Sequence, residues 1–265
     1  MDNKRIEELA KNPRFITGIY NYCDRWCERC VFTSRCMNYA LSEVESSDPE
    51  TRDINNKAFW DKLGEILSST LEMVKEKAKE MGIDLDAIDY EKIANEEEQV
   101  HRMAEKQPYS IAAMEYIGKV DDWFKSNKEQ LEAKGDELVS QSQACISDTN
   151  PEDDAVKIND CLEVIRWYEH QIYVKLCRAA TGLICTNPND TEFSIDDANG
   201  SAKVAIIGIE RSIAAWAGLL PHFPEQEGSI LGLLVILKRL QAQVESAFPN
   251  ARSFQRPGFD TEKPK

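Results

Sequence analysis

The sequence predicts an all-α fold. Apolar residues recur at steps of three and four along most of the 265-residue chain, which is the spacing of one face of an α-helix. Alternating apolar and polar runs bounded by hairpin dipeptides, the signal of β-strands, are scarce. Two segments, Ser47–Glu50 and Asn150–Asp153, each combine a capping side chain, a proline at the first helical position and early acidic residues. We therefore expect a bundle of about six main helices.

The same signals divide the chain into three parts. Residues 1–46 are a cysteine-rich N-terminal segment, which we expect to be helical from Arg14 to about Cys30. Residues 47–248 are expected to form a helical bundle domain. Residues 249–265 follow the last helix and are expected to be a flexible tail.

Six helices are expected within the bundle domain. In chain order they are 55–81, 86–106, 109–143, 151–181, 201–220 and 229–248. Gly82 ends the first, Pro108 lies just beyond the second, and Gly135 is a weak point of the third. The fourth helix is apolar around most of its circumference, which predicts a central position.

The segment 182–200 is predicted to be a connection, because it carries Pro188 and many Asn and Asp residues. Its length is unusual for a compact bundle and favours either a functional loop or a surface crossover between helices. Within it, Asp196–Lys203 could form a helix start that binds a phosphate with its backbone amides, or simply an N-cap.

Composition and charge limit the classes of partner. The chain has 42% hydrophobic and 30% charged residues, which is typical of a globular protein. Its longest apolar run, Ile230–Leu237, is too short for a membrane span, and acidic residues near Met1 replace the apolar core of a secretory signal. The net charge of −15 disfavours binding to nucleic acid or anionic lipid. We expect a cytoplasmic protein without nucleic-acid or membrane partners, whose acidic surface would suit a protein with a basic surface.

Four of the eight cysteines, Cys23, Cys27, Cys30 and Cys36, follow the spacing C-x3-C-x2-C-x5-C. On a helix the first three would share one face, and a turn after Cys30 would bring Cys36 back as the fourth ligand. Thiolates bind zinc or an iron–sulfur cluster. Structural zinc sites usually join two separated ligand pairs, so ligands from one short segment favour the cluster. The alternative is a buried helical stripe in which the cysteines act as small hydrophobic residues.

The spacing of the first three cysteines resembles that of radical S-adenosylmethionine enzymes, over the eight residues Cys23–Cys30 only. That family carries its motif after the first strand of a β/α barrel, and this sequence predicts neither a preceding strand nor βα alternation. A fourth cysteine would also occupy the iron that such enzymes leave open. The resemblance therefore assigns no family to the chain.

Carboxylates on apolar helix faces are a second candidate site. Glu169 and Glu210 are each in step with apolar residues of their helices, and Glu98 with His101 forms a Glu-x-x-His pair. Helical di-metal proteins hold iron or manganese with such groups. The alternative is that Glu169 and Glu210 lie in a buried ionic network with arginines such as Arg166, Arg178 or Arg211. In that alternative, Glu98 belongs to a solvated acidic run.

Three functional hypotheses follow. The first is a metal-binding helical protein whose four-cysteine site holds an iron–sulfur cluster in preference to zinc and serves electron transfer, sensing or folding. The second is an oxidoreductase with a di-metal carboxylate centre in the bundle core. The third is a protein–protein interaction module in which zinc stabilises the N-terminal segment. The sequence encodes no defined substrate or reaction.

Overall fold

The structure is a computed structural model, and it describes residues 3–45, 49–144, 150–185 and 191–260. All regular structure within these ranges is helical, and no strand occurs in them. The predicted all-α class is therefore confirmed. The described residues contain nine α-helices, more than the six main helices expected. None of these helices is both long and apolar enough to cross a membrane.

The chain divides into two compact units. Unit 1 consists of residues 1–96 together with residues 255–265, and unit 2 consists of residues 97–254. The boundary lies within helix α4 (Tyr90–Glu105), and the end of the chain belongs to the same unit as the cysteines. The two units are described separately below.

Unit 1 contains α1 (Asn3–Ala10), α2 (Met37–Glu45) and α3 (Lys57–Glu80). The helix expected from Arg14 to Cys30 is wrong, because this range holds only short 3-10 turns. Two residues interrupt it with left-handed backbone, Gly18 at φ 74° and Arg25 at φ 59°. An α-helix of L-residues does not accommodate that conformation.

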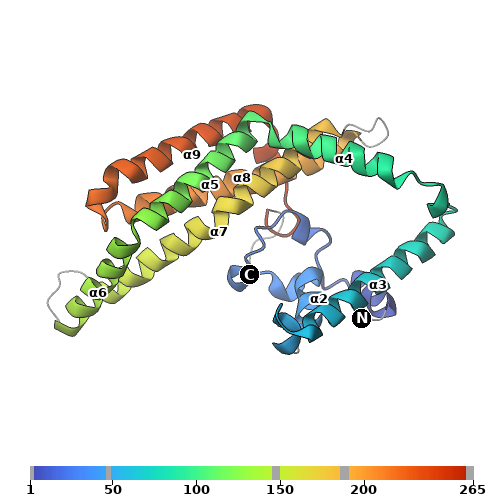
Figure 1. Cartoon of the computed structure of the whole chain (residues 1–265), viewed down its shortest axis with the longest axis horizontal. Helices are drawn as coiled ribbons and strands as arrows, with labels where there is room; N and C mark the ends of the chain where they lie inside the picture. Colours follow the sequence, from blue (N-terminus) through green and yellow to red (C-terminus); the bar gives the residue numbers. More distant parts are fainter. Residues whose placement is uncertain (1–2, 46–48, 145–149, 186–190, 261–265) are drawn as a thin grey trace. The chain divides into compact units, whose positions relative to one another are not determined.

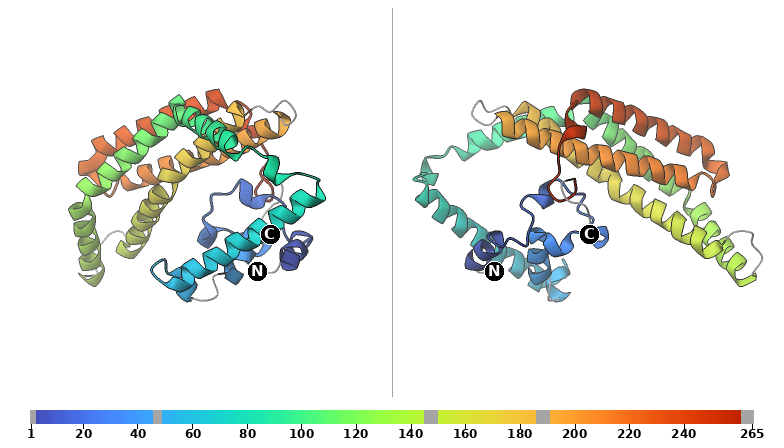
Figure 2. Two further views of the ribbon diagram at one scale, coloured as in Figure 1. Left: turned by 45° about the vertical axis from the view of Figure 1, so that its right-hand side comes forward. Right: turned by 180° about the vertical axis from the view of Figure 1, so that it is seen from behind.

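Unit 2 is a helical bundle. Its helices are α5 (Pro108–Ser126), α6 (Lys128–Ala144), α7 (Pro151–Ile184), α8 (Thr191–Leu219) and α9 (Glu227–Ala247). Helices α5, α7, α8 and α9 form a closed set in which each packs against two of the others (Figure 1). The view from behind shows α8 and α9 side by side (Figure 2). Helix α6 packs on α7.

Aromatic side chains fill the core of this bundle. Trp216 of α8 is fully buried, and its ring meets that of Trp123 edge-on at 4.9 Å between centroids. The Trp216 Nε1–H donates a hydrogen bond of 2.9 Å to the hydroxyl of the equally buried Tyr116. A buried indole N–H needs such an acceptor, so α5 and α8 are joined by a specific polar contact within an apolar core.

Helix α7 begins as the sequence predicts. The Asn150 side chain accepts a hydrogen bond of 3.1 Å from the Glu152 N–H, and Pro151 occupies the first helical position. Helix α7 packs against α5, α6 and α8, which confirms its central position.

The single helix expected over 109–143 is wrong, because the chain breaks between α5 and α6 at Asn127. The Asn127 side chain turns back and donates to the Trp123 carbonyl oxygen at 2.7 Å. Asparagine competes with helix continuation in this way. Gly135, the expected weak point, lies inside α6.

The long connection expected over 182–200 is also wrong, because α8 begins at Thr191; residues 186–190 lie outside the described residues. Asp196–Lys203 is therefore helix interior, and neither a phosphate-binding helix start nor an N-cap forms there. Packing of α8 on α7 explains why this part of the chain is helical. A Cβ at Gly182 would lie 3.1 Å from that of Ala198, and Arg178 forms a 2.5 Å ion pair with Asp197. Close tertiary contact overrides poor helix propensity.

Candidate metal centre

Cys23, Cys27, Cys30 and Cys36 line one small cavity in unit 1. Its volume is about 20 Å³. A single water-sized body needs roughly 10–15 Å³, so the cavity has room for one such body. The remaining lining is largely apolar and aromatic; it includes Ile19, Tyr20, Trp26, Phe32, Tyr39 and Phe259.

A left-handed turn separates the first two cysteines. The Cys23 thiol donates to the Tyr20 carbonyl at 3.5 Å, and the Cys27 N–H bonds to the Arg25 carbonyl at 3.0 Å. Arg25 is the one non-glycine residue with positive φ in the described ranges. Such a conformation is unfavourable for a side chain with a Cβ and persists where surrounding contacts impose it. The turn thus brings Cys27 back toward Cys23 within four residues.

Two 3-10 turns position the other cysteines. The first, Cys27–Arg29, is closed by the Cys30 N–H bonding to the Cys27 carbonyl at 3.1 Å. The second, Thr33–Arg35, ends where the Cys36 N–H bonds to the Thr33 carbonyl at 3.2 Å. The Phe32 N–H also donates to the Cys30 sulfur at 3.4 Å. An amide donor of this kind stabilises a thiolate.

The end of the chain supplies one wall of the cavity. The Phe259 ring meets that of Phe32 edge-on, with centroids 5.1 Å apart. Gly258, at φ 78°, lies so close to Ile19 that a Cβ would meet its Cδ1 at 2.9 Å. The sequence did not identify Phe259 as a site residue. Its Pro-Gly context signals a turn but not the surface on which the turn packs.

The thiols are disfavoured as free anions in this cavity. Burial raises the pKa of Cys27, and the negative charges of the other three thiolates raise it further. Burial likewise raises the pKa of Cys30, opposed by the hydrogen bond from the Phe32 N–H. A bound cation would offset both the burial of the thiolates and their mutual repulsion, because it compensates the clustered negative charge.

Among the described residues, no group of three or more His, Cys, Asp or Glu side chains is arranged to hold a metal ion as it stands. The four thiols share a cavity without forming a finished coordination sphere. Metal binding at this site would therefore require rotation of the cysteine side chains.

The carboxylate candidates do not converge. Glu98 pairs with Arg102 at 2.5 Å and His101 pairs with Glu105 at 3.2 Å, and all four side chains are exposed on α4. Glu210 of α8 accepts hydrogen bonds from Arg252 at 2.7 Å and from Gln241 at 3.0 Å.

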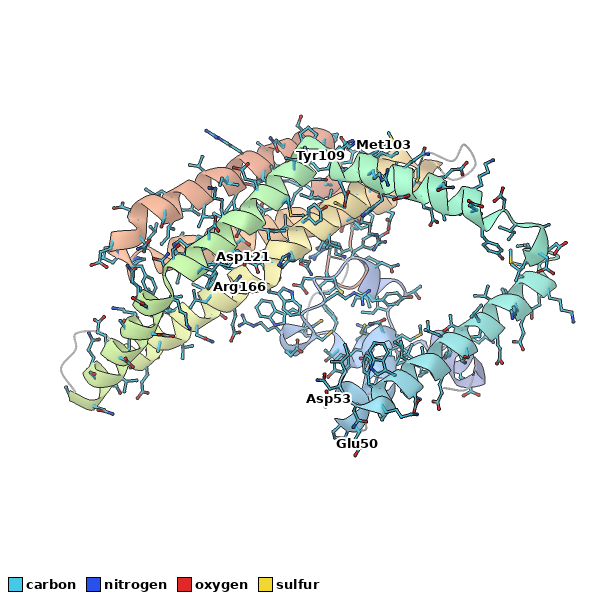
Figure 3. The ribbon with its side chains drawn as sticks, viewed as in Figure 1. Glu50, Asp53, Met103, Tyr109, Asp121 and Arg166 are labelled. Carbon is cyan, nitrogen blue, oxygen red and sulfur yellow. The ribbon has the colours of Figure 1, made fainter. Side chains whose placement is uncertain are left out.

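Glu169 is buried, as its helix face predicts, at 4% exposure. Arg166 contacts it at 3.1 Å and also donates to Asp121 at 2.9 Å, so the guanidinium joins α7 to α5 (Figure 3). His170 lies 3.7 Å from the Glu169 carboxylate. The arginine alternative is thus confirmed for Glu169, whereas Glu210 pairs with Arg252, which was not among the candidates. The four predicted di-metal ligands, Glu98, His101, Glu169 and Glu210, thus meet different partners.

The stability of the folded protein should depend on pH through Glu169. Burial raises its pKa, against the opposing effect of Arg166. The folded protein therefore keeps this proton to higher pH than the unfolded chain, so stability is lost as the pH rises from the ordinary glutamate range through the raised pKa. We expect Glu169→Gln to gain stability relative to the wild type as the pH rises from about 4, the ordinary glutamate pKa, through the raised pKa. Urea unfolding across this range measures it, and parallel profiles for the two proteins would contradict it.

The remaining cysteines are not gathered into a site. Cys161 is half-buried, Cys177 is buried with its sulfur 3.9 Å from the Ser110 hydroxyl, and Cys185 is exposed. Cys145 lies outside the described residues. Among the described residues, the cysteines that lie together are therefore Cys23, Cys27, Cys30 and Cys36.

A larger cavity of about 550 Å³ lies in unit 2 between α5 and α9. Its lining is a mixture of small, amide and apolar side chains with Lys119 and Asp122. Neither Glu169 nor Glu210 lines it, so the bundle cavity and the buried carboxylates are separate features.

Comparisons of this chain with protein-family models, with curated proteins and with solved structures found no match.

Proposed function

We propose that this chain is a metal-binding helical protein in which Cys23, Cys27, Cys30 and Cys36 hold a thiolate-bound metal centre. The observation that carries the proposal is the single cavity that all four thiols line. Cysteine sulfur selects zinc or iron–sulfur clusters among common biological centres. The apolar wall, the amide donor to Cys30 and the mutual repulsion of the thiolates all suit a site that is completed by a cation.

The spacing of the ligands favours an iron–sulfur cluster. All four come from one short segment and not from two distant pairs, which is typical of the ligands of iron–sulfur clusters. The four cysteines are also only half-buried, so a cluster here would lie near the surface, where electron exchange with a partner or sensing of an oxidant is accessible.

Zinc is the second candidate, and the size of the cavity favours it. A volume of about 20 Å³ has room for one ion-sized body, and a cluster is larger. For either group the thiols would have to rearrange, since they form no finished coordination sphere. In that case the metal would stabilise unit 1 without redox chemistry, and the protein would act as an interaction module.

Purification of the full chain without oxygen, followed by metal and sulfide analysis and visible absorption, distinguishes the candidates. Iron with inorganic sulfide and an absorption that bleaches on reduction supports the cluster. Colourless protein with one zinc ion per chain supports the second candidate. Protein that takes up neither metal, even after incubation of the reduced chain with iron and sulfide or with zinc, contradicts the proposal.

A further inference from the structure

The cavity between α5 and α9 in unit 2 has the size of a binding site for a small organic molecule. The two helices pack side by side (Figure 1). Residues of α5, α6, α9 and the turn before α9 enclose about 550 Å³. Sites for small molecules measure about 300–1,000 Å³. The cavity shares no lining residue with the cysteine site, so an inference drawn from it does not rest on a bound metal.

Two glycines leave room for an occupant on the side of α9. Gly228 and Gly232 both line the cavity and lie one helical turn apart on the same face. Beyond the backbone of their own helix and their chain neighbours, no atom lies within 4 Å of the place that a Cβ would take at either residue. No close packing contact therefore requires glycine at these positions. What the two glycines provide is open space.

Hydrogen bonds hold the polar part of the lining in place. The Trp123 Nε1–H donates to the Ser229 hydroxyl at 3.2 Å, and this hydroxyl donates to the Gln226 carbonyl at 2.8 Å. The Gln226 side-chain amide donates to Oε1 of Gln130 at 2.8 Å, which joins the turn before α9 to α6. The cavity is thus formed by contacts within the protein itself, as most small-molecule sites are.

Three polar groups of the lining are not engaged by the protein. Asn127 is 5% exposed, and its amide nitrogen donates to a backbone carbonyl of α5 at 2.7 Å, so its Oδ1 is left as an acceptor that receives no hydrogen bond from the described residues. An acceptor on so deeply buried a side chain needs a donor from water or from a ligand.

The other two groups are charged. Lys119 and Asp122 lie three residues apart on α5 and both line the cavity, yet within the described part of the chain neither forms an ion pair. Opposite charges at the same spacing do pair elsewhere in this bundle, as Lys134 does with Glu137 at 2.9 Å. The cavity thus presents one ammonium and one carboxylate that are available to an occupant.

We propose that this cavity binds a free amino acid with an apolar side chain. Lys119 pairs with the carboxylate of the ligand, whereas Asp122 and Oδ1 of Asn127 accept hydrogen bonds from its ammonium group. The apolar side chain lies against Trp123 and Leu233, which supply aromatic and aliphatic surface. Because the lining carries one charge of each sign, it suits a zwitterion better than a simple anion or cation.

Isothermal titration calorimetry of the full chain with leucine and with phenylalanine tests the proposal. At least one of them is expected to bind saturably, with a Kd below about 1 mM. The methyl ester of that amino acid lacks the carboxylate, and its N-acetyl form lacks the ammonium group. Each derivative is expected to bind at least about tenfold more weakly. No saturable binding of either amino acid, or derivatives that bind as tightly as the parent, would overturn the proposal.

Gly232→Leu tests the location of the site, because it places a side chain in the open space of the cavity. We expect it to abolish binding while circular dichroism and stability match or exceed those of the wild type, since leucine favours a helix over glycine. The matched control is Gly135→Leu, in α6. Gly135 also has open space around it but does not line the cavity, so this variant should bind as the wild type does. Equal binding by the two variants would place the ligand elsewhere and contradict the inference.

Two charge variants test how the ligand is recognised. Lys119→Ala and Asp122→Ala, both at exposed positions, are expected to weaken binding at least about tenfold without unfolding the bundle. Lys119→Ala should also lose the preference for the free amino acid over its methyl ester, and Asp122→Ala the preference over the N-acetyl form. Lys128→Ala, at an exposed lysine of α6 outside the cavity, is the control. Variants that retain the wild-type preferences would exclude Lys119 and Asp122 as the groups that hold the ligand.

Discussion

Replacement of Cys27 by serine is expected to abolish the bound metal and to loosen unit 1 while the helices of unit 2 persist. Cys27 occupies the centre of the four-cysteine segment, and its charge interacts with all three other thiols. Serine has nearly the same shape, but its hydroxyl neither ionises near neutral pH nor provides the soft sulfur ligand that zinc or iron selects. Because structural zinc binding supplies about 10–16 kcal/mol in small metal domains, loss of one ligand removes a large part of the stability of the segment.

Metal content and limited proteolysis measure this effect. Cleavage should appear within residues 10–45, and most of the helical circular dichroism should remain because unit 2 has its own core. Cys185→Ser is the matched control, since Cys185 is an exposed cysteine at the end of α7 and should retain the full metal content. Equal metal content in the two variants would remove Cys27 from the site.

Trp216→Ala is expected to cause the largest loss of stability in unit 2, about 3–5 kcal/mol. The side chain is fully buried, contacts Trp123, and donates to Tyr116, so its removal leaves a cavity and a buried hydroxyl without its donor. Urea unfolding followed by circular dichroism measures the loss.

Two further variants separate packing from hydrogen bonding. Tyr116→Phe keeps the ring but leaves the Trp216 N–H without its acceptor, and it should destabilise by about 1–3 kcal/mol. Val156→Ala, at a position that is 69% exposed on α7, should change stability little. A Trp216→Ala protein as stable as Val156→Ala would show that the aromatic cluster is not the core of the bundle.

The local signals in the sequence predicted much of the bundle. Asn150 and Pro151 mark the start of α7 because capping depends on neighbouring residues only, and the period of apolar residues placed Glu169 on a buried face. The break at Asn127 and the early start of α8 were missed. The break at Asn127 is itself a local effect, because the side chain turns back onto the carbonyl four residues earlier. The early start of α8 depends on a tertiary contact, the close approach of Gly182 to Ala198.

The sequence likewise predicted part of the candidate site and missed the rest. The short spacing of the cysteines was enough to predict that Cys23 and Cys36 share a site region, and they line one cavity. The backbone conformation that brings them together differs from the prediction, since left-handed Arg25 and 3-10 turns replace the expected helix. The wall formed by Phe259 could not be predicted, because more than 200 residues separate it from the cysteines and no periodicity links them. The partners of the candidate carboxylates could not be predicted, because face patterns locate a carboxylate on a buried face but not the side chain it meets there.

X-ray absorption at the metal edge, on full-length protein purified without oxygen, tests the central claim most directly. We expect a first shell made of sulfur at about 2.3 Å, together with loss of the metal signal in Cys27→Ser but not in Cys185→Ser. A metal with a nitrogen or oxygen first shell, or a signal that persists in Cys27→Ser, would contradict a centre held by Cys23, Cys27, Cys30 and Cys36.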